Sequence, residues 1–500
     1  MKNIVILGGG TAGWMTANLL QKKWRQRGIQ ISVVESPDIG IIGVGEGSTP
    51  LLKEFFDSLE ISESEWMPQC NATYKNGISF NDWSTVPGYE SYFHPFPCSL
   101  DFATFGFLYK YTELRRKGAD VLAHPNRFSL MAGLTERKLA PLPEENFPFH
   151  FQYGYHFDSV LIGKFLREKA KESGVSHIEA TVEKVEQESD GSVKSLLLNT
   201  GQILSGDFFV DCSGFASILL QKTLKVPFVS FAENLFNDSA VAIPTDIETE
   251  IPAETLSTAL SNGWAWKIPL TNRFGNGYVF SSKYCSPDEA ETELRSHLNI
   301  LESDVEARHL KMKVGRVQET WAKNCVAVGL SQGFIEPLEA TALQFVYSTI
   351  EQFSQALEEG NFSGKNRDEF NARMNANFEG VRDYIVLHYK TNSRSDSQYW
   401  IDNRENQKIS HNLRSMIECW YAVEDTQEAL TRLNIGSYYS QRSWTCLLAG
   451  VGVFPKQENL VVPDKEKAGM ALKDLKYVDD FIKGCSMNFK SHGKLLSKQV

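Results

Sequence analysis

The sequence predicts an α/β fold built on a parallel sheet, and three observations support this prediction. A β-branched apolar run at residues 4–7 is followed over 12–19 by apolar residues at helical spacing. A second apolar run at 29–34 completes a strand–helix–strand unit, whose two strands must be parallel. Two later apolar runs, 207–210 and 325–328, each lead toward a glycine, as buried strands of such a sheet do.

The remaining periodicity predicts further helices and one hairpin. Apolar residues at helical spacing predict helices over 158–171 and 343–357, and the second helix should end at Gly360. A strand at 181–185 should continue into a hairpin whose turn lies at 189–192. The last 140 residues have mostly helical patterns, and no internal repeat interrupts the chain.

Composition and charge exclude several classes of protein. The chain has 500 residues, of which 42% are hydrophobic and 23% charged, as in an ordinary globular protein. Its net charge of −11 argues against nucleic acid as a partner, because phosphate neutralisation needs a basic surface. No apolar run is long enough to cross a membrane, and the first residues lack the features of a signal peptide. The cysteines form no CxxC pair, so the sequence gives no sign of a metal site. We expect a cytoplasmic protein without metal, and the oligomeric state, a homo-oligomer included, stays open.

A dinucleotide-binding fingerprint follows the first strand. Gly8, Gly10 and Gly13 form a GxGxxG, in which Thr11 and Ala12 open the helix that should receive a pyrophosphate. Glu35 follows Gly13 by 22 residues and ends the second strand, where a carboxylate can accept hydrogen bonds from a ribose diol. Strand, glycines, helix, strand and terminal glutamate together predict a dinucleotide cofactor.

Two further strand-and-turn segments favour FAD over NAD. Residues 210–214 and 324–329, the latter ending at Gly329, have a layout that resembles the FAD-dependent monooxygenases with two dinucleotide-binding motifs. This resemblance implies a Rossmann-like, monooxygenase-type fold. No second GxGxxG is present for a nicotinamide cofactor, so we expect FADH2 to be supplied by a separate flavin reductase.

Four more motifs resemble those of the flavin-dependent tryptophan halogenases. They occur in the order of that family, and the resemblance covers roughly the first 420 residues. The segments are the glycine-rich GVGEGSTP at 43–50, YKNGI at 74–78 around Lys75, GWAWKIP at 263–269 with its WxWxIP, and GFIEPLEATA at 333–342.

The resemblance implies two catalytic residues, Lys75 and Glu339. In such enzymes reduced flavin and dioxygen oxidise halide to hypohalous acid. An ammonium group can hydrogen-bond this electrophile or form a haloamine, and a carboxylate can orient it and accept the proton of the attacked ring. From the residues alone, Lys75 would be an ordinary solvated lysine and Glu339 a helix-start charge that favours the helix dipole.

The resemblance also implies the residues that contact halide, flavin and substrate. The backbone at Thr341 and Ala342, where a helix starts, is a natural halide site. Here the sequence departs from the family pattern, because Ala340 and Ala342 replace the usual serine and glycine, and the halide preference stays open among chloride, bromide and iodide. By the same resemblance, Gly43, Val44 and Gly45 lie beside the flavin. Trp264 and Trp266 keep the substrate away from the flavin. His94, Phe96 and Pro337 line the substrate site or the tunnel.

The resemblance implies FADH2- and O2-dependent halogenation of an electron-rich arene, with tryptophan, indole and related rings left open. Tyr399, Trp400 and Trp444 either cover the substrate or pack in the core. A flavin-dependent aromatic hydroxylase and a catalytically silent FAD-binding redox protein remain as alternatives. We expect a FAD-binding monooxygenase-like region at 1–360, with substrate-site excursions at about 70–155 and 220–310, and a mainly helical substrate-covering region at 361–500.

Overall fold

The structure is a computed structural model that describes residues 1–40, 43 and 45–497. The chain divides into two compact units, each assembled from three separate segments. The first unit contains residues 1–72, 157–232 and 312–379, and the second contains 73–156, 233–311 and 380–500. The domain boundaries expected from the sequence stay a prediction. No helix within the described residues is long and apolar enough to cross a membrane.

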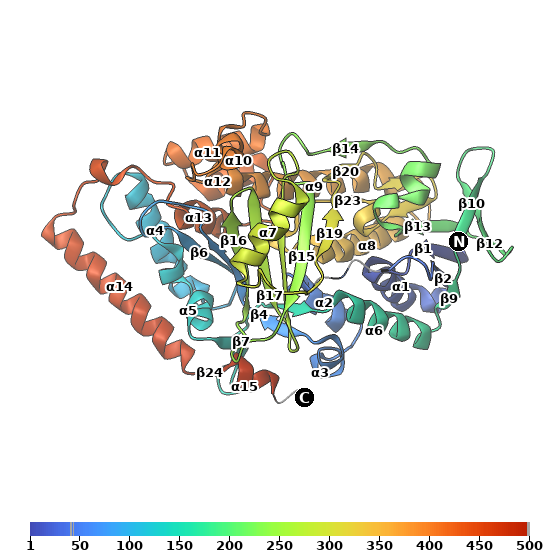
Figure 1. Ribbon diagram of the computed structural model, residues 1–500, viewed down its shortest axis with the longest axis horizontal. Helices are drawn as coiled ribbons and strands as arrows, with labels where there is room; N and C mark the ends of the chain where they lie inside the picture. Colours follow the sequence, from blue (N-terminus) through green and yellow to red (C-terminus); the bar gives the residue numbers. More distant parts are fainter. Residues whose placement is uncertain (41–42, 44, 498–500) are drawn as a thin grey trace. The chain divides into compact units, whose positions relative to one another are not determined.

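A six-stranded sheet forms the centre of the first unit (Figure 1). Five of its strands are parallel, and only β21 runs antiparallel to its neighbour. In sheet order the strands are β21 (Trp321–Ala322), β22 (Cys325–Ala327), β13 (Phe208–Asp211), β1 (Asn3–Leu7), β2 (Gln30–Glu35) and β9 (Ser176–Glu179). The parallel strands predicted from the apolar runs are therefore confirmed.

Helix α1 (Thr11–Trp24) packs against β1 and β2 of this sheet and also contacts α6 (Ser159–Glu172) and α8 (Ala342–Glu359). The α6 helix begins where Asp158 accepts hydrogen bonds from the backbone N–H groups of Val160 and Leu161, as an N-cap residue does. The α8 helix ends before Gly360, as its apolar period predicted.

Short strands and helices complete the first unit. The predicted hairpin exists and belongs to an antiparallel sheet of β10, β11 and β12. The elements are β3 (Glu46–Gly47), α2 (Leu51–Ser58), α3 (Glu63–Trp66), β10 (Val182–Gln187), β11 (Val193–Leu198), β12 (Ile203–Ser205), β14 (Phe228–Ser230), β20 (Gly315–Val317) and β23 (Gly333–Phe334).

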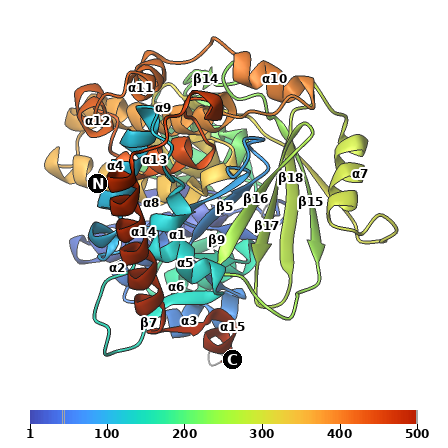
Figure 2. The same cartoon turned by 90° about the vertical axis from the view of Figure 1, so that its left-hand side faces the viewer.

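The second unit is built on a seven-stranded, mostly antiparallel sheet, whose strands β15 to β18 lie side by side in Figure 2. Helix α7 (Pro287–His297) covers β15 and β18 and starts with a capping box between Ser286 and Glu289. In sheet order the strands are β19 (Arg308–Lys311), β15 (Ser239–Thr245), β18 (Phe274–Phe280), β17 (Gly263–Pro269), β16 (Glu254–Leu260), β5 (Gly77–Asn81) and β6 (Ser91–Pro95).

Two short strand pairs and several helices surround this sheet. Strand β4 (Thr73–Lys75) pairs with β8 (Gly154–Phe157), and β7 (Leu139–Pro143) pairs with β24 (Phe489–Ser491). Helices α4, α5, α13 and α14 contribute to one apolar core. The helices are α4 (Phe105–Arg116), α5 (Leu130–Glu136), α10 (Gln398–Glu405), α11 (His411–Tyr421), α12 (Thr426–Leu433), α13 (Gln441–Gly450), α14 (Lys465–Ser486) and α15 (His492–Leu496). Helix α9 (Arg367–Lys390) belongs to the first unit up to residue 379 and to the second unit from residue 380.

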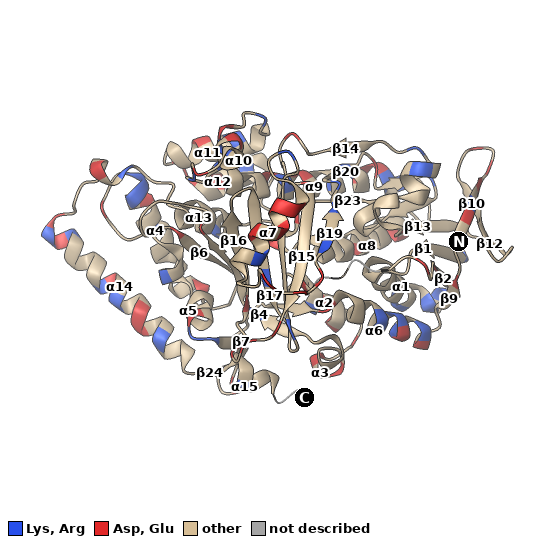
Figure 3. Ribbon diagram, viewed as in Figure 1, with Lys and Arg blue, Asp and Glu red and all other residues tan. Residues whose placement is uncertain are grey.

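The predominance of helix after residue 360 confirms that the last 140 residues are mostly helical, whereas their role in covering the substrate stays a prediction. Figure 3 shows basic and acidic residues interspersed along the ribbon of α14, whose lysines alternate with aspartates and glutamates. Alternating charges of this kind are typical of a solvent-exposed helix with local ion pairs. They do not form the continuous basic surface that nucleic acid binding needs.

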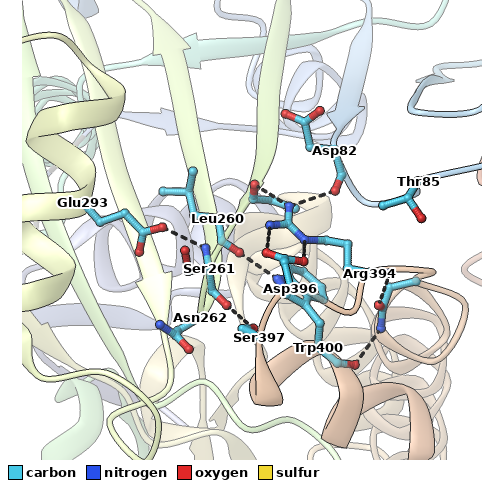
Figure 4. A network of polar contacts seen from close by, with 12 residues as sticks. Asp82, Thr85, Leu260, Ser261, Asn262, Glu293, Arg394, Asp396, Ser397 and Trp400 are labelled. Atoms are coloured by element: carbon cyan, nitrogen blue, oxygen red, sulfur yellow. Dashed lines mark hydrogen bonds and ion pairs between the residues drawn. The ribbon is translucent and has the colours of Figure 1, made fainter.

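The Arg394 guanidinium joins strand ends of the second unit to its helical part (Figure 4). It donates to the carbonyl oxygens of Asp82, after β5, and Ala259, on β16, at 3.0 Å each. It also forms a two-pronged ion pair with Asp396 and lies 5.2 Å from the ring of Trp400. The indole N–H of Trp400 donates to Leu260, so this tryptophan packs in the core.

Replacing Arg394 by alanine should therefore destabilise the second unit. Two carbonyl groups and one carboxylate lose their donor, which predicts a loss of roughly 2–4 kcal/mol and a lower midpoint of thermal unfolding. Arg432→Ala is a matched control, because Arg432 is largely exposed and lies 3.9 Å from Glu424. Equal unfolding midpoints for the two variants would contradict the role given to Arg394.

Candidate active site

The glycine turn between β1 and α1 is closely packed at Gly8 and Gly13 and open at Gly10. Gly8 has a φ of 119°, and a Cβ atom on Gly13 would overlap the Gly8 carbonyl oxygen. Around Gly10 there is open space, and the backbone N–H groups of Thr11 and Ala12 begin the helix. An anion can therefore approach the helix start without meeting a side chain.

Two other turns contact this one, because the parallel strands end at the same edge of the sheet. A Cβ atom on Gly8 would overlap the Cys212 carbonyl oxygen, in the turn after β13. A Cβ atom on Gly329, after β22, would lie 2.8 Å from the Ala12 side chain, and the φ of Gly329 is 72°. The structure thus brings together three of the glycine-containing segments singled out in the sequence.

Glu35 is the last residue of β2 and lies under the glycine turn. A Cβ atom on Gly9 would overlap its side chain, and its Oε2 atom is 2.9 Å from Nε2 of His177. The carboxylate is therefore held at the strand end, next to the backbone of the turn. Sequence reasoning placed Glu35 here but had no signal for His177, which comes from the neighbouring strand β9.

The buried Asp211 carboxylate holds the turn after β13. It accepts hydrogen bonds from the N–H groups of Ser213, Leu219 and Leu220 and from the Ser213 hydroxyl. Burial raises the pKa of Asp211, while these hydrogen bonds lower it. Its role is structural, since the carboxylate points into backbone donors of its own turn.

The glycine-rich segment at 43–50 lies against the start of α6. A Cβ atom on Gly43 would lie 2.7 Å from the Ser159 hydroxyl oxygen, and Gly45 has a φ of 84°. Val44 lies outside the described residues. Burial raises the pKa of Glu46 to about 7, with Asp158 raising it further and the Ser159 hydroxyl lowering it. The charge of this segment therefore changes near neutral pH.

Lys75 is the last residue of β4 in the second unit, and its side chain is fully buried. Its Nζ atom lies 5.6 Å from the centroid of the Phe96 ring, within the range of a cation–π contact. A solvated surface lysine, the alternative left open by the sequence, is therefore excluded for Lys75. The structure brings together two predicted site residues, Lys75 and Phe96.

A buried hydrogen-bond chain connects β4 to the WxWxIP strand. The Thr73 hydroxyl donates to the carbonyl oxygen of Pro269 at 2.7 Å, so Nδ1 of His156, 3.0 Å away, must donate to Thr73. Nε2 of His156 then accepts from Thr255. Burial, and next the nearby charge of Lys75, hold the pKa of His156 well below its usual range. His156 is therefore neutral.

Trp264 and Trp266 occupy one face of β17, near the middle of the antiparallel sheet. Both are buried, and their ring centroids are 6.3 Å apart. The indole N–H of Trp266 has no hydrogen-bond partner within the part of the chain that the structure describes.

His94 belongs to a cluster of aromatic rings formed with the C-terminal helices. Its ring centroid is 6.0 Å from that of Tyr384, which stacks on Tyr439 at 3.6 Å and meets Trp444 edge-on at 5.5 Å. Sequence reasoning named His94 and Trp444 but missed Tyr384 and Tyr439. The Tyr438–Tyr439 pair before α13 was the available signal for the latter.

The GFIEPLEATA segment places Glu339 next to the start of α8 in the first unit. Glu339 is 5% exposed, whereas Pro337 is exposed. Ala340 has a φ of 55°, a left-handed conformation that costs a residue with a side chain about 1–2 kcal/mol. Thr341 is the N-cap of α8 but makes no side-chain capping hydrogen bond, and Ala342 is the first helical residue. The backbone N–H groups at this helix start therefore do not donate to the Thr341 side chain.

An α/β unit with these strand-end turns has the architecture of a dinucleotide-binding oxidoreductase. Residues 3–465 match the protein family described as tryptophan halogenase. The chain is 37% identical over 524 aligned residues to the 7-chloro-L-tryptophan 6-halogenase KtzR of Kutzneria sp. (strain 744), with 99% of both proteins covered.

Solved structures give the same result. The tryptophan 6-halogenase SttH of Streptomyces toxytricini superposes with a TM-score of 0.87 at 34% identity, covering 99% of both chains. BrvH, a flavin-dependent halogenase of Brevundimonas sp. BAL3, gives a TM-score of 0.84 at 32% identity, covering 100% of this chain and 99% of that one.

The chain belongs to the tryptophan halogenase family and is a flavin-dependent halogenase, an oxidoreductase that uses a flavin and a halide. The predicted family, fold class and enzyme class are confirmed. Membership of this family argues against the two alternatives left open by the sequence, which were an aromatic hydroxylase and a catalytically silent flavoprotein.

The open space at Gly10 generates a prediction about the flavin. Gly10→Ala should leave thermal stability unchanged, since its Cβ atom meets nothing within 4 Å, yet weaken FAD binding roughly tenfold by crowding the pyrophosphate. Gly13→Ala is the contrasting variant and should destabilise the fold. Both effects can be measured by thermal unfolding and FAD fluorescence titration; unaltered FAD affinity in Gly10→Ala would place the pyrophosphate elsewhere.

Proposed function

We propose that this enzyme replaces a ring hydrogen of an electron-rich arene, such as indole, tryptophan or a related ring, by halogen, with Lys75 as its catalytic lysine. The burial of the Lys75 ammonium beside the Phe96 ring carries the proposal. A charged group is costly to bury, and a fold retains it where it has a task. Relatives with tryptophan halogenase in their names support an aromatic substrate.

The residues around the glycine turn would hold FAD. Gly8, Gly10 and Gly13, with Thr11 and Ala12, would receive the pyrophosphate, since the cradle is open at Gly10. Further contacts would come from Glu35 to the ribose, from Gly329, and from Gly43, Val44 and Gly45. When bound in reduced form, FAD together with dioxygen supplies the oxidising chemistry that turns halide into hypohalous acid.

Lys75 would hold the hypohalous acid through its ammonium protons. The halogen is transferred as the electrophile to a ring carbon, the ring loses its proton, and the hydroxide left behind takes up a proton to form water. The carboxylate of Glu339 would stabilise the cationic ring and accept that proton. The positive charge of Lys75 would stabilise the departing hydroxide, and the negative charge of Glu339 would stabilise the cationic ring.

The helix start at Thr341 and Ala342 would bind the halide through backbone N–H groups. The absence of a capping side chain from Thr341 supports this assignment, because a capping oxygen would compete with an anion. The residues contribute no charge of their own, so chloride, bromide and iodide all remain acceptable in chemical terms.

Aromatic rings of the second unit would contact the substrate. His94 and Phe96 are partly exposed and offer flat faces that suit an indole, while the buried Tyr384, Tyr439 and Trp444 form the packing on which His94 rests. From the family resemblance we assign Trp264 and Trp266 to separating substrate from flavin, and Pro337 to the passage of the electrophile.

Reduced flavin would come from a separate flavin reductase, because the sequence has a single GxGxxG. The cytoplasmic location expected from the sequence, and the oligomeric state left open there, stay untested predictions.

Lys75→Ala should abolish halogenation while preserving FAD binding and peroxide release. We expect at least a roughly 100-fold loss of product, because the electrophile is no longer held. The assay supplies FAD, a flavin reductase, a panel of indoles and phenols and each halide, with detection by mass spectrometry. Lys110→Ala, at a lysine paired with Asp474, is the matched control. Halogenated product from Lys75→Ala would refute the role of Lys75, and oxygen insertion without halogen would refute the proposed reaction.

Glu339→Gln should reduce halogenation roughly 10- to 100-fold, since the amide keeps the shape of the side chain but cannot accept the ring proton. Glu351→Gln, at a half-buried residue of α8 in an ion pair with Lys23, should remain fully active. If steady-state product formation is unaltered in Glu339→Gln, the carboxylate serves only the helix dipole.

A further inference from the structure

The C-terminal helix α15 delivers a buried histidine to the strand that carries Lys75. His492 is the first residue of α15 and is fully buried. The pairing of β24 with β7 fixes the preceding backbone, and the N–H of His492 donates to the carbonyl oxygen of Lys138 at 2.9 Å. This segment lies beyond residue 465, where the match to the family ends.

Both ring nitrogens of His492 are engaged by the main chain. Its Nδ1 atom is 2.9 Å from the carbonyl oxygen of Ile251 and must donate to it. Its Nε2 atom therefore carries a lone pair and accepts from the backbone N–H of Tyr74 at 3.1 Å. A single neutral tautomer satisfies both contacts.

The neutral tautomer is the stable one in this environment. Burial lowers the pKa of His492 to about 4, outweighing the backbone carbonyl groups of Ile251 and Pro252, which raise it. The Tyr74 ring meets the imidazole edge-on with centroids 6.1 Å apart.

We propose that His492 is a positioning residue for halogenation: by accepting the Tyr74 N–H, it fixes the short strand β4 and thereby the ammonium of Lys75. The inference rests on the proposed catalytic role of Lys75. Strand β4 has three residues. One edge pairs with β8, Thr73 bonds to Pro269, and His492 supplies the acceptor for the N–H of Tyr74, the residue next to Lys75. On the far side of Lys75, the N–H of Asn76 donates to Ala253 at 2.7 Å, so Lys75 lies between two fixed peptide groups.

Without an acceptor at His492, the buried N–H of Tyr74 has to find another partner, and β4 has to move. A misplacement of about 1 Å can cost a reaction roughly 100-fold. The glycine turn that would receive the pyrophosphate belongs to the first unit, so FAD affinity is measured as a separate readout.

Two substitutions separate the hydrogen bond from the packing of the ring. His492→Phe keeps a planar ring next to Tyr74 but offers no acceptor, whereas the amide oxygen of His492→Gln can accept the Tyr74 N–H. Leu496→Ala is a control for destabilisation, since Leu496 is a buried residue of the same short helix. The experiment uses the full chain with FAD, a flavin reductase, halide and indole.

We expect His492→Phe to lower the kcat for halogenated indole roughly 10- to 100-fold with an unaltered KM, while free hypohalous acid captured by a dimedone trap increases. His492→Gln should recover most of the lost kcat, and Leu496→Ala should lower the unfolding temperature without increasing trapped hypohalous acid.

Two outcomes would overturn the inference: wild-type kcat in His492→Phe, or equal losses in the Phe and Gln variants. The result for Lys75→Ala keeps the two proposals apart. Halogenation by Lys75→Ala would remove the proposed function itself, whereas an inactive Lys75→Ala together with an active His492→Phe would remove only the role of His492.

Discussion

The burial of the Lys75 side chain is the constraint on which the second unit depends. An ammonium group loses its hydration on burial, so the protein around it must avoid adding further positive charge. Burial, and next the charge of Lys75, keep the pKa of the nearby His156 low and the ring neutral, and hydrogen bonds use both ring nitrogens. A protonated imidazole would present a donor at Nε2, where neutral His156 accepts from Thr255, and it would repel Lys75. The neutral tautomer of His156 therefore avoids repulsion with the Lys75 ammonium, and the neutral tautomer of His492 binds the backbone of β4.

The first unit depends on the common edge of its parallel strands. β1, β13 and β22 are neighbours in the sheet, so the turns that follow them contact each other although they are far apart in the sequence. Backbone atoms rather than side chains fill the contacts at Gly8 and Gly13. A site made of backbone N–H groups suits a pyrophosphate, which needs many donors of fixed direction. The organisation of this unit thus follows from strand order.

Prediction from the sequence succeeded where a local pattern determines the outcome. The parallel strands, α1, α6 and α8 follow from apolar periodicity, and Glu35 and Gly329 follow from motifs at strand ends. The partners of these residues were not predictable in the same way. His177 contacts Glu35 from another strand, and Tyr384 reaches His94 from a C-terminal helix. An isolated histidine or tyrosine has no local signature, because its role depends on long-range packing.

The residues around Glu339 illustrate a different limit of sequence reasoning. The replacement of serine and glycine by Ala340 and Ala342 is visible in the sequence, yet its meaning depends on conformation. Ala340 adopts the left-handed region, where a methyl side chain cannot form the local hydrogen bond that a hydroxyl could. Thr341 contributes no cap either. In the proposed halide site, backbone N–H groups would therefore act without help from neighbouring hydroxyls, and such a site distinguishes halides by size and hydration more than by specific hydrogen bonds.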